Sequence, residues 1–245
     1  MRHSPADAPH PASTPAATTS PAAAPAAAPA AAVEAAVEAS GAAPVVSGPG
    51  GPFPRLLAWL LTLGSGIGLL AAFTLTVEKI ALLRDPAYVP TCSLNPVLSC
   101  GSVMSTPQAE AFGVPNPLLG VAGFAVVATV GVALLGGARL PRWFWLGLQA
   151  GVTFGAVFVH WLIYQSLQVI GALCPYCMAV WAVTIPVFWY VTLHNLHQRH
   201  LPAPARARRA IQALTGLHAV PLTVWFLTLI ALIGVRFWSY WSTLL

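Results

Sequence analysis

The chain has 245 residues, of which only 7% are charged and 57% are hydrophobic. A soluble domain carries about 25% charged residues, so this chain lacks the charge that a water-exposed surface requires. The composition excludes an ordinary soluble enzyme, a coiled coil and a nucleic-acid binder that works through a broad basic surface. It predicts a polytopic membrane protein.

The first part of the chain, residues 1–52, is rich in alanine and proline. Proline recurs too often there for a stable helix. Bulky apolar side chains, which could offset the entropy cost of ordering, are scarce. We therefore expect residues 1–52 to be a disordered tail.

Five long apolar stretches follow the tail. Each is long enough to cross a ~30 Å hydrocarbon core, which takes about 20 helical residues. Backbone groups in lipid must be hydrogen-bonded within the segment, so these stretches should be helices and the fold all-α. The stretches are approximately 56–83, 117–137, 143–168, 173–193 and 216–243.

Basic side chains are distributed unevenly around these spans. Eight of the eleven lysines and arginines precede the first span or lie in the loops after the second and fourth spans. The other three are Lys79, Arg84 and Arg236. Because basic residues accumulate on the cytoplasmic side, we expect a multi-pass protein of the plasma membrane with a cytoplasmic N-terminus and an extracytoplasmic C-terminus. The basic loop over 194–215 would then be cytoplasmic.

All four cysteines fall in segments that this topology places outside the cytoplasm. Cys92 and Cys100 lie in the long loop between the first two spans. Cys174 and Cys177 form the sequence Cys-Pro-Tyr-Cys at the beginning of the fourth span. Disulfides persist in extracytoplasmic compartments, so the cysteine positions and the arginine distribution agree independently.

A Cys-x-x-Cys pair at the start of a helix suits reversible redox chemistry. Cys174 would face the N-terminal amides and the positive end of the helix dipole, which stabilise a thiolate. Pro175 is compatible with the first helical turn. Cys177 lies about one turn deeper and would point into the bundle. There it could meet a lipid-soluble two-electron acceptor, for which a quinone is the natural candidate.

Two other interpretations of the cysteines stay open at this point. The four thiols could form two static structural disulfides, or they could bind zinc. The separation of Cys92 from Cys100 is not typical of a zinc knuckle, and a Cys-x-x-Cys bridge is usually exchangeable. A redox relay is therefore the favoured interpretation, and structural bridges are the main alternative.

The order of the two pairs separates known groups of thiol oxidoreductases. Glutaredoxins share Cys-Pro-Tyr-Cys but are soluble, and in the disulfide-generating DsbB proteins the Cys-x-x-Cys comes first. The order found here resembles the vitamin K epoxide reductase family, and its bacterial members in particular. The resemblance covers roughly residues 56–193, and the segment Cys92 to Gly120 carries most of it. It implies a four-helix bundle around a quinone pocket over residues 53–193. The last apolar stretch adds a fifth transmembrane helix, expected over 216–245.

The resemblance also implies a role for each cysteine. Cys92 would be attacked by a DsbA-like thioredoxin-fold partner. Cys100 would pass electrons to Cys174 through a transient inter-loop disulfide, and Cys177 would reduce the quinone. Asn116, in Val-Pro-Asn-Pro-Leu-Leu-Gly, corresponds to an asparagine that hydrogen-bonds a quinone oxygen, and we also expect its side chain to cap the second span.

At one further position this chain has a different residue from the family, and at another two residues could fill the same family role. Animal members have a tyrosine that donates to the other quinone oxygen, whereas this chain has Trp181, whose indole N–H donates but cannot titrate as a phenol does. Either Ser105 or Thr106 corresponds to a functional hydroxyl. Many bacterial relatives carry a fused thioredoxin-like domain, but this sequence ends at Leu245, so we expect the partner to be a separate polypeptide.

The resulting hypothesis is a thiol–disulfide:quinone oxidoreductase that supports extracytoplasmic disulfide formation. It would take electrons from the DsbA-like partner and use menaquinone or ubiquinone as acceptor, without a metal and without a nucleic-acid partner. The alternatives are reduction of another acceptor, such as a quinone epoxide, and a membrane scaffold with structural disulfides.

Several polar residues lie inside the predicted spans. His160, Gln165 and Gln168 in the third span are candidates for function, although interhelical hydrogen bonds explain them equally well. Glu78 and Lys79 are expected to snorkel or to form a local ion pair.

Other polar residues lie close to the ends of the spans. We expect His194, His197 and His200 to belong to a solvated segment that faces the lipid headgroups. Arg236 is expected to anchor the fifth span at the membrane interface.

Overall fold

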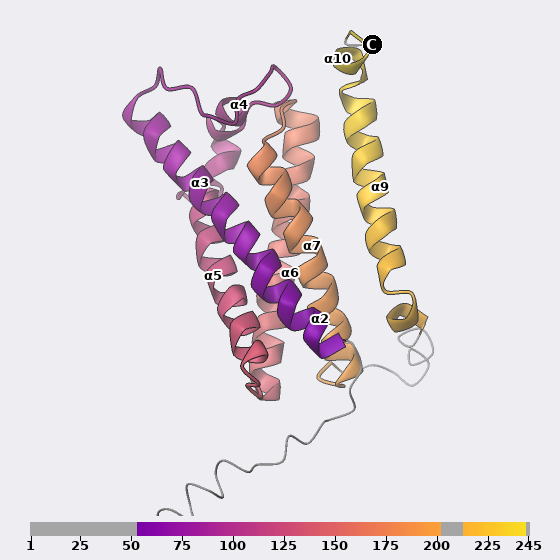
Figure 1. Cartoon of the computed structure of the whole chain (residues 1–245). Helices are drawn as coiled ribbons and strands as arrows, with labels where there is room; N and C mark the ends of the chain where they lie inside the picture. Colours follow the sequence, from indigo (N-terminus) through magenta and orange to yellow (C-terminus); the bar gives the residue numbers. More distant parts are fainter. Residues whose placement is uncertain (1–52, 202–212, 244–245) are drawn as a thin grey trace, which may run out of the picture. The chain divides into compact units, whose positions relative to one another are not determined.

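The structure is a computed structural model that describes residues 53–201 and 213–243. The predicted tail over 1–52 and half of the predicted loop over 194–215, residues 202–212, lie outside these residues. Five of the described helices are long and apolar enough to cross a membrane (Figure 1). The fold class is therefore that of an all-α polytopic membrane protein, as the sequence predicts. The five spans are Arg55–Arg84, Asn116–Leu135, Arg142–Ile170, Pro175–His197 and Ala219–Arg236.

The first span consists of three consecutive helical segments. Helix α2 (Phe53–Trp59) continues into the π-helix η1 (Leu60–Gly64) and then into α3 (Ser65–Arg84). The π turn coincides with a close approach of the second span, because a Cβ on Gly131 would lie 2.5 Å from the backbone nitrogen of Thr62. Any side chain at Gly131 would push the two helices apart, so this crossing depends on a small residue.

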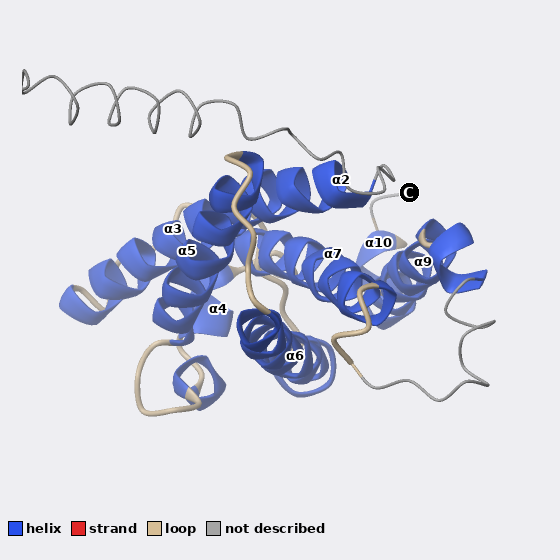
Figure 2. Cartoon of the chain, turned by 90° about the horizontal axis from the view of Figure 1, so that it is seen from below, coloured by secondary structure: helices blue, strands red, loops and turns tan. Residues whose placement is uncertain are grey.

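Helices α5 (Asn116–Leu135), α6 (Arg142–Tyr164) and α7 (Pro175–His197) complete the bundle. Helix α3 packs against both α5 and α7, and α6 packs against α7, whereas α5 and α6 make little direct contact (Figure 2). Apolar side chains pack between these helices. The buried set includes Leu57, Leu61, Ala72, Phe124, Val127, Val152 and Val187.

Large apolar side chains also cover the outside of the spans. Leu70, Val157 and Val235 are 69%, 66% and 77% exposed. In water, a continuous apolar surface of this kind would drive association. In a bilayer the same surface faces hydrocarbon, which agrees with the membrane assignment.

Helix α6 ends in an irregular turn. It continues into the π-helix η3 (Gln165–Ile170), in which the backbone N–H of Gly171 donates to the carbonyl of Ser166 at 3.0 Å. Gly171 has a φ of 69°, a left-handed conformation that favours glycine. The short segment 172–174 then leads directly into α7.

The loop between α3 and α5 lies at one end of the bundle (Figure 1). It contains the short helix α4 (Cys100–Met104) and the 3-10 helix η2 (Pro107–Glu110). We call this the cysteine end. The end at which α5 joins α6 and at which α7 finishes is called the opposite end.

The fifth span is shorter than the sequence predicts. A continuous run was expected over 216–243, but α9 (Ala219–Arg236) stops before Phe237, and a separate short helix, α10 (Trp238–Trp241), follows. The Phe237 side chain explains the break, because it turns inward and is buried against α6, η3 and α7 side chains.

Candidate functional site

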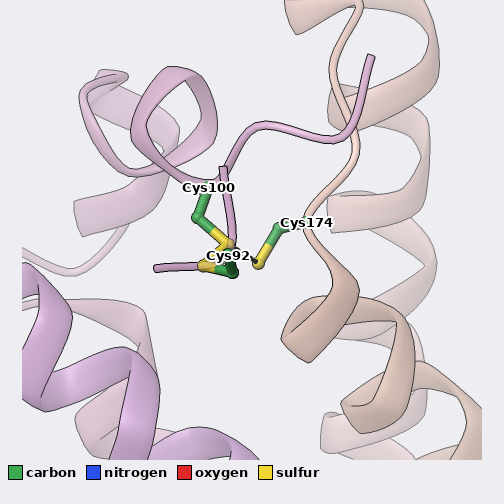
Figure 3. A group of neighbouring side chains, drawn as sticks. All are labelled: Cys92, Cys100 and Cys174. Atoms are coloured by element: carbon green, nitrogen blue, oxygen red, sulfur yellow. Dashed lines mark hydrogen bonds between the residues drawn. A yellow bond between two sulfur atoms is a disulfide. The ribbon is translucent and has the colours of Figure 1, made fainter. Parts of the chain in front are cut away.

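Three of the four cysteines form a sulfur cluster at the cysteine end (Figure 3). Cys92 and Cys100 are joined in a disulfide, and Cys174 and Cys177 are free thiols. The Sγ atom of Cys174 lies 3.1 Å from the Sγ atom of Cys100. Cys100 and Cys174 are almost completely buried, at 0% and 1% exposure. A free thiol is thus in contact with a disulfide sulfur inside the protein.

A pair of backbone hydrogen bonds places these two sulfurs together. The N–H of Leu173 donates to the carbonyl of Val97, and the N–H of Ser99 donates to the carbonyl of Leu173, both at 2.8 Å. They form a parallel bridge between Leu98 and Leu173. Cys174 directly follows Leu173, and Cys100 lies two residues after Leu98, so the register of this bridge determines which sulfurs meet.

Cys174 occupies the N-cap position of α7, and Pro175 is in its first turn, as the sequence predicts. The backbone N–H of Cys177 donates to the Cys174 sulfur at 3.4 Å. A hydrogen bond from the Cys177 side chain lowers the pKa of Cys174, and the backbone amides of Cys177 and Tyr176 act in the same direction. Burial and the Glu78 carboxylate oppose this shift without cancelling it. Cys174 is therefore the better placed nucleophile of the pair.

Glu78 holds the segment that carries Cys92. Its carboxylate is buried and accepts a hydrogen bond from Tyr88 Oη at 2.9 Å and further hydrogen bonds from the hydroxyl and the N–H of Thr91. The Tyr88 hydrogen bond to this carboxylate raises the pKa of the phenol. Glu78 therefore neither snorkels nor pairs with Lys79; it fixes the residue that precedes Cys92.

Lys79 holds the other side of the same loop. Its Nζ donates to the carbonyl of Met104 at 2.8 Å and pairs with Glu110 at 3.0 Å. Lys79 is buried, so the expected snorkelling is wrong, while the expected ion pairing is found with a residue from η2. Consecutive charged residues at the end of α3 thus anchor both sides of the cysteine loop.

A cavity of about 710 Å³ lies below the sulfur cluster, between α3, α5, α6 and α7. Its size falls in the range of small-molecule sites, and its walls are mostly apolar. Cys177 contributes to the wall, so the second thiol of the Cys-x-x-Cys faces the cavity while the first faces the loop disulfide. The polar residues in the wall are Thr106, Gln108, Asn116, Gln165, Ser166 and Thr184.

Asn116 lines the cavity, but it does not cap α5. The N-cap residue is Pro115, and no side chain caps this helix. Asn116 Oδ1 instead accepts from the N–H of Ala111 at 3.0 Å, and its Nδ2 donates to the carbonyl of Gln108 at 2.7 Å. The expected capping role is therefore wrong. The amide orients η2 over the cavity, and one of its two N–H bonds remains for a ligand.

The remaining candidate residues for quinone binding differ in whether they line the cavity. Trp181 is 1% exposed and lines the cavity, and its indole N–H has no hydrogen-bond partner among the described residues. Thr106 also lines the cavity, whereas Ser105 does not. Both hydroxyls donate to backbone carbonyls of α4, at 2.7 Å for Ser105 and 2.8 Å for Thr106.

The polar residues of the third span also differ from one another. Gln165 lines the cavity, whereas Gln168 is exposed on the other side of η3. His160 accepts a hydrogen bond from Trp225 Nε1 at 2.9 Å, which is the interhelical interaction considered for it from the sequence. For Gln165 and Gln168 the sequence could not decide, because both lie in the π-helix, which changes the face on which each side chain lies.

The sulfur cluster also resembles a metal site in its dimensions. The sulfurs of Cys92, Cys100 and Cys174 all lie within 4.8 Å of one another. Zinc binds thiolates, but two of these sulfurs are bonded to each other. What the described residues provide here is a disulfide beside a thiol, an arrangement for thiol–disulfide exchange.

A family model described as "Vitamin K epoxide reductase family" matches residues 59–192, which is more than half of the chain. The matched segment contains all four cysteines, Asn116 and Trp181. Helix α9 lies outside it.

Proposed function

The chain belongs to the vitamin K epoxide reductase family, whose members are membrane oxidoreductases, and we propose that it is a thiol–disulfide:quinone oxidoreductase. In this function electrons pass from an external dithiol to the Cys92–Cys100 pair, then to the Cys174–Cys177 pair, and finally to a quinone in the cavity.

The observation that carries this proposal is the 3.1 Å contact between the sulfurs of Cys100 and Cys174. In the forward direction, the Cys100 thiolate attacks Cys174 in the Cys174–Cys177 disulfide. A Cys100–Cys174 bond forms, and Cys177 leaves as a thiolate. Cys92 then attacks Cys100, which restores the loop disulfide and releases Cys174. Two electrons have moved from one pair to the other without an external reagent.

The cysteine states in the structure correspond to the end of that exchange. The loop pair is oxidised, and the Cys-x-x-Cys pair is reduced. Because Cys177 lines the cavity, the reduced pair can transfer its two electrons to an acceptor there, and the Cys174–Cys177 disulfide re-forms. The two thiols also supply two protons, so dithiol and quinone balance as disulfide and quinol.

The cavity residues support a quinone as the acceptor. A quinone combines an apolar ring and tail with two carbonyl oxygens, and the cavity combines apolar walls with a few donors. In this proposal the free N–H of Asn116 and the indole N–H of Trp181 bind the two oxygens, and Thr106 supplies the family hydroxyl. Gln165, from η3, is a further donor that lines the cavity. The quinone is menaquinone or ubiquinone.

The external dithiol is proposed to be a separate DsbA-like thioredoxin-fold protein that attacks Cys92 on the extracytoplasmic side of the plasma membrane. Cys92 is only 6% exposed, so docking must displace part of the loop that covers it. The anchors at Glu78 and Lys79 then determine how easily the loop opens. This topology follows the arginine distribution, with the N-terminus in the cytoplasm and the C-terminus outside.

The proposal is tested by following quinone reduction by absorbance in purified protein supplied with a reduced DsbA-like protein. Wild type is compared with Cys92→Ala and Cys177→Ala. We expect turnover in wild type and none in either variant. After chemical reduction of the protein, Cys92→Ala should perform one turnover and Cys177→Ala should perform none.

A different set of results would contradict the proposal. If wild type fails to reduce menaquinone and ubiquinone while both cysteine pairs stay intact in mild reductant, the disulfides are structural and the chain is a scaffold. If only a quinone epoxide is reduced, electron transfer between the cysteine pairs is still supported, but the proposed quinone acceptor is wrong.

A further inference from the structure

We propose that the fifth helix is a positioning element for the exchange between the two cysteine pairs, and that Arg236 performs this role. The inference rests on the proposed function, because it concerns the step in which Cys100 and Cys174 exchange. Helix α9 lies outside the segment matched by the family, so the family assignment does not account for it.

The central contact joins the end of α9 to the end of the α6–η3 helix. Arg236 Nε donates to the backbone carbonyl of Leu167 at 2.6 Å. Carbonyls in the last turn of a helix lack backbone donors from that helix, and a cation there also interacts favourably with the helix dipole. Arg236 therefore acts as a cap for η3 that is supplied by a different helix.

The capped turn leads directly to the reactive thiol. Gly171 follows η3 in the left-handed conformation, and a Cβ on Gly171 would lie 3.7 Å from Arg236 Nη2. Leu173 then makes its two backbone hydrogen bonds with Val97 and Ser99. Cys174 comes next. Displacement of η3 would therefore move the strand-like segment that places Cys174 against Cys100.

Apolar packing links the same parts of the chain. Phe237, the residue after Arg236, is buried in one cluster with Leu167, Leu173 and Trp181. The junction between α9 and α10 thus contacts η3 through a charged hydrogen bond and through an aromatic side chain. It also reaches Trp181, which lines the cavity.

Other contacts hold α9 independently of Arg236. Trp225 Nε1 donates to His160 Nε2 at 2.9 Å, and Trp189 Nε1 donates to the carbonyl of His218 at 2.9 Å. Both lie away from the cysteine end. Loss of the Arg236 contact should therefore leave α9 docked while the turn before Cys174 loses its cap.

The test measures the exchange step alone, in a Cys177→Ala background. In that protein the Cys174 thiolate attacks Cys100 of the loop disulfide, a Cys100–Cys174 disulfide forms, and Cys92 is released as a thiol. Alkylation followed by peptide mapping gives the proportion of alkylated Cys92 to alkylated Cys174 over time. Because one thiol is free before and after the step, no oxidant is needed.

Three further substitutions are compared in this background. Arg236→Met removes the charge and the donor, and Arg236→Lys restores both. Arg84→Met removes another exposed arginine from the cysteine end; its side chain has no polar contact among the described residues. Misplacement of reacting groups by about 1 Å costs up to about 100-fold in rate. We expect Arg236→Met to slow formation of the Cys100–Cys174 disulfide by about 10- to 100-fold, with recovery in Arg236→Lys and no change in Arg84→Met.

A second assay distinguishes positioning from general destabilisation. In a Cys92→Ala/Cys100→Ala background, dithiothreitol reduces the Cys174–Cys177 pair directly, and quinone reduction reports the later step. Arg236→Met should impair this later step less than it impairs the exchange. Equal losses in both assays, or equal exchange rates in Arg236→Met and its parent, would overturn the inference. Failure of the parent Cys177→Ala protein to form the inter-loop disulfide would instead overturn the proposed function.

Discussion

At the opposite end of the bundle, Asn195 is completely buried, yet its polar atoms are satisfied. Its Nδ2 donates to Trp145 O at 3.3 Å and to Gln149 Oε1 at 2.9 Å, and its Oδ1 accepts from His200 Nδ1 at 3.0 Å. The ring of His194 lies on that of Trp145 with centroids 4.0 Å apart. These contacts are hydrogen bonds and ring packing, and none of them involves a covalent bond that can change partners.

The cysteine end also buries polar groups, but it does so around atoms that can change partners. Cys100 is bonded to Cys92 and touches Cys174. Glu78 and Lys79 hold the loop around these sulfurs. The same helices thus form a hydrogen-bonded frame at one end and bring a disulfide and a thiol together at the other. Substitutions at the two ends should therefore affect different measurements.

The largest expected effect is at the cysteine end. Cys100→Ala removes the sulfur that receives Cys174, so partner-driven quinone reduction should fall to background. Dithiothreitol-driven reduction through Cys174 and Cys177 should persist, because that pair and the cavity are intact. Steady-state rates with both reductants test this, and partner-driven turnover in the variant would refute the relay.

Weakening the contacts that hold the cysteine loop should make the Cys92–Cys100 disulfide easier to reduce. Lys79→Met leaves the Met104 carbonyl and Glu110 without their cation, and a hydrogen bond to a charged group contributes about 1.5–3 kcal/mol. We expect reduction of the Cys92–Cys100 disulfide by dithiothreitol to become about 10- to 100-fold faster as the loop opens more often. The rate is measured by quenched alkylation.

Glu110→Gln is the matched control for Lys79→Met. It weakens the same ion pair from the more exposed side, where the side chain is 39% exposed, and leaves the Lys79 hydrogen bond to Met104 in place. Exposed pairs contribute about 0–1 kcal/mol, so the disulfide should be reduced only a few-fold faster. Equal effects of the two substitutions would mean that Lys79 does not hold the loop through Met104.

The opposite end should respond in stability and not in redox chemistry. Asn195→Leu removes the hydrogen-bond partner of Gln149 Oε1 and of His200 Nδ1, which should lower the free energy of unfolding by about 1–3 kcal/mol. Thermal unfolding in detergent measures this change. Below the unfolding transition the variant should reduce quinone at the wild-type rate; a selective loss of turnover would show that the two ends are coupled.

The smallest expected effect concerns pH. The hydrogen bond from Cys177 lowers the pKa of Cys174. In a Cys92→Ala/Cys100→Ala background, where Cys174 cannot form the inter-loop disulfide, Cys177→Ala should therefore raise that pKa. At neutral pH the thiolate fraction of Cys174 then falls, and its alkylation slows and recovers at higher pH. The pH midpoint of Cys174 alkylation is the measurement. A midpoint that stays constant or moves down in Cys177→Ala would contradict the proposed hydrogen bond.

Features that depend on local sequence were predictable. The spans follow from continuous apolar runs, and the N-cap position of Cys174 follows from Cys-Pro-Tyr-Cys before such a run. The two pairs of cysteines were also evident. The contact between the two cysteine pairs was implied only by the family resemblance, because the bridge between Leu98 and Leu173 joins residues that are distant in sequence.

Features that depend on tertiary contacts were not predictable. His194 and His200 were expected in a solvated segment, but they pack on Trp145, and desolvation lowers the pKa of His200. Asn116 was expected to cap α5 and instead binds the loop. Arg236 was expected only at the membrane interface. The partners of the histidines and of Arg236 come from distant parts of the chain. Those of Asn116 lie in the loop just before it, whose fold the sequence does not signal.

In the proposed relay, Cys100 and Cys174 exchange electrons by forming a disulfide with each other. The most direct measurement is mass spectrometry of Cys177→Ala, digested under non-reducing conditions after alkylation. We expect a peptide pair linked through Cys100 and Cys174, together with an alkylated Cys92. Recovery of only the Cys92–Cys100 linkage, with Cys174 alkylated, would contradict the account.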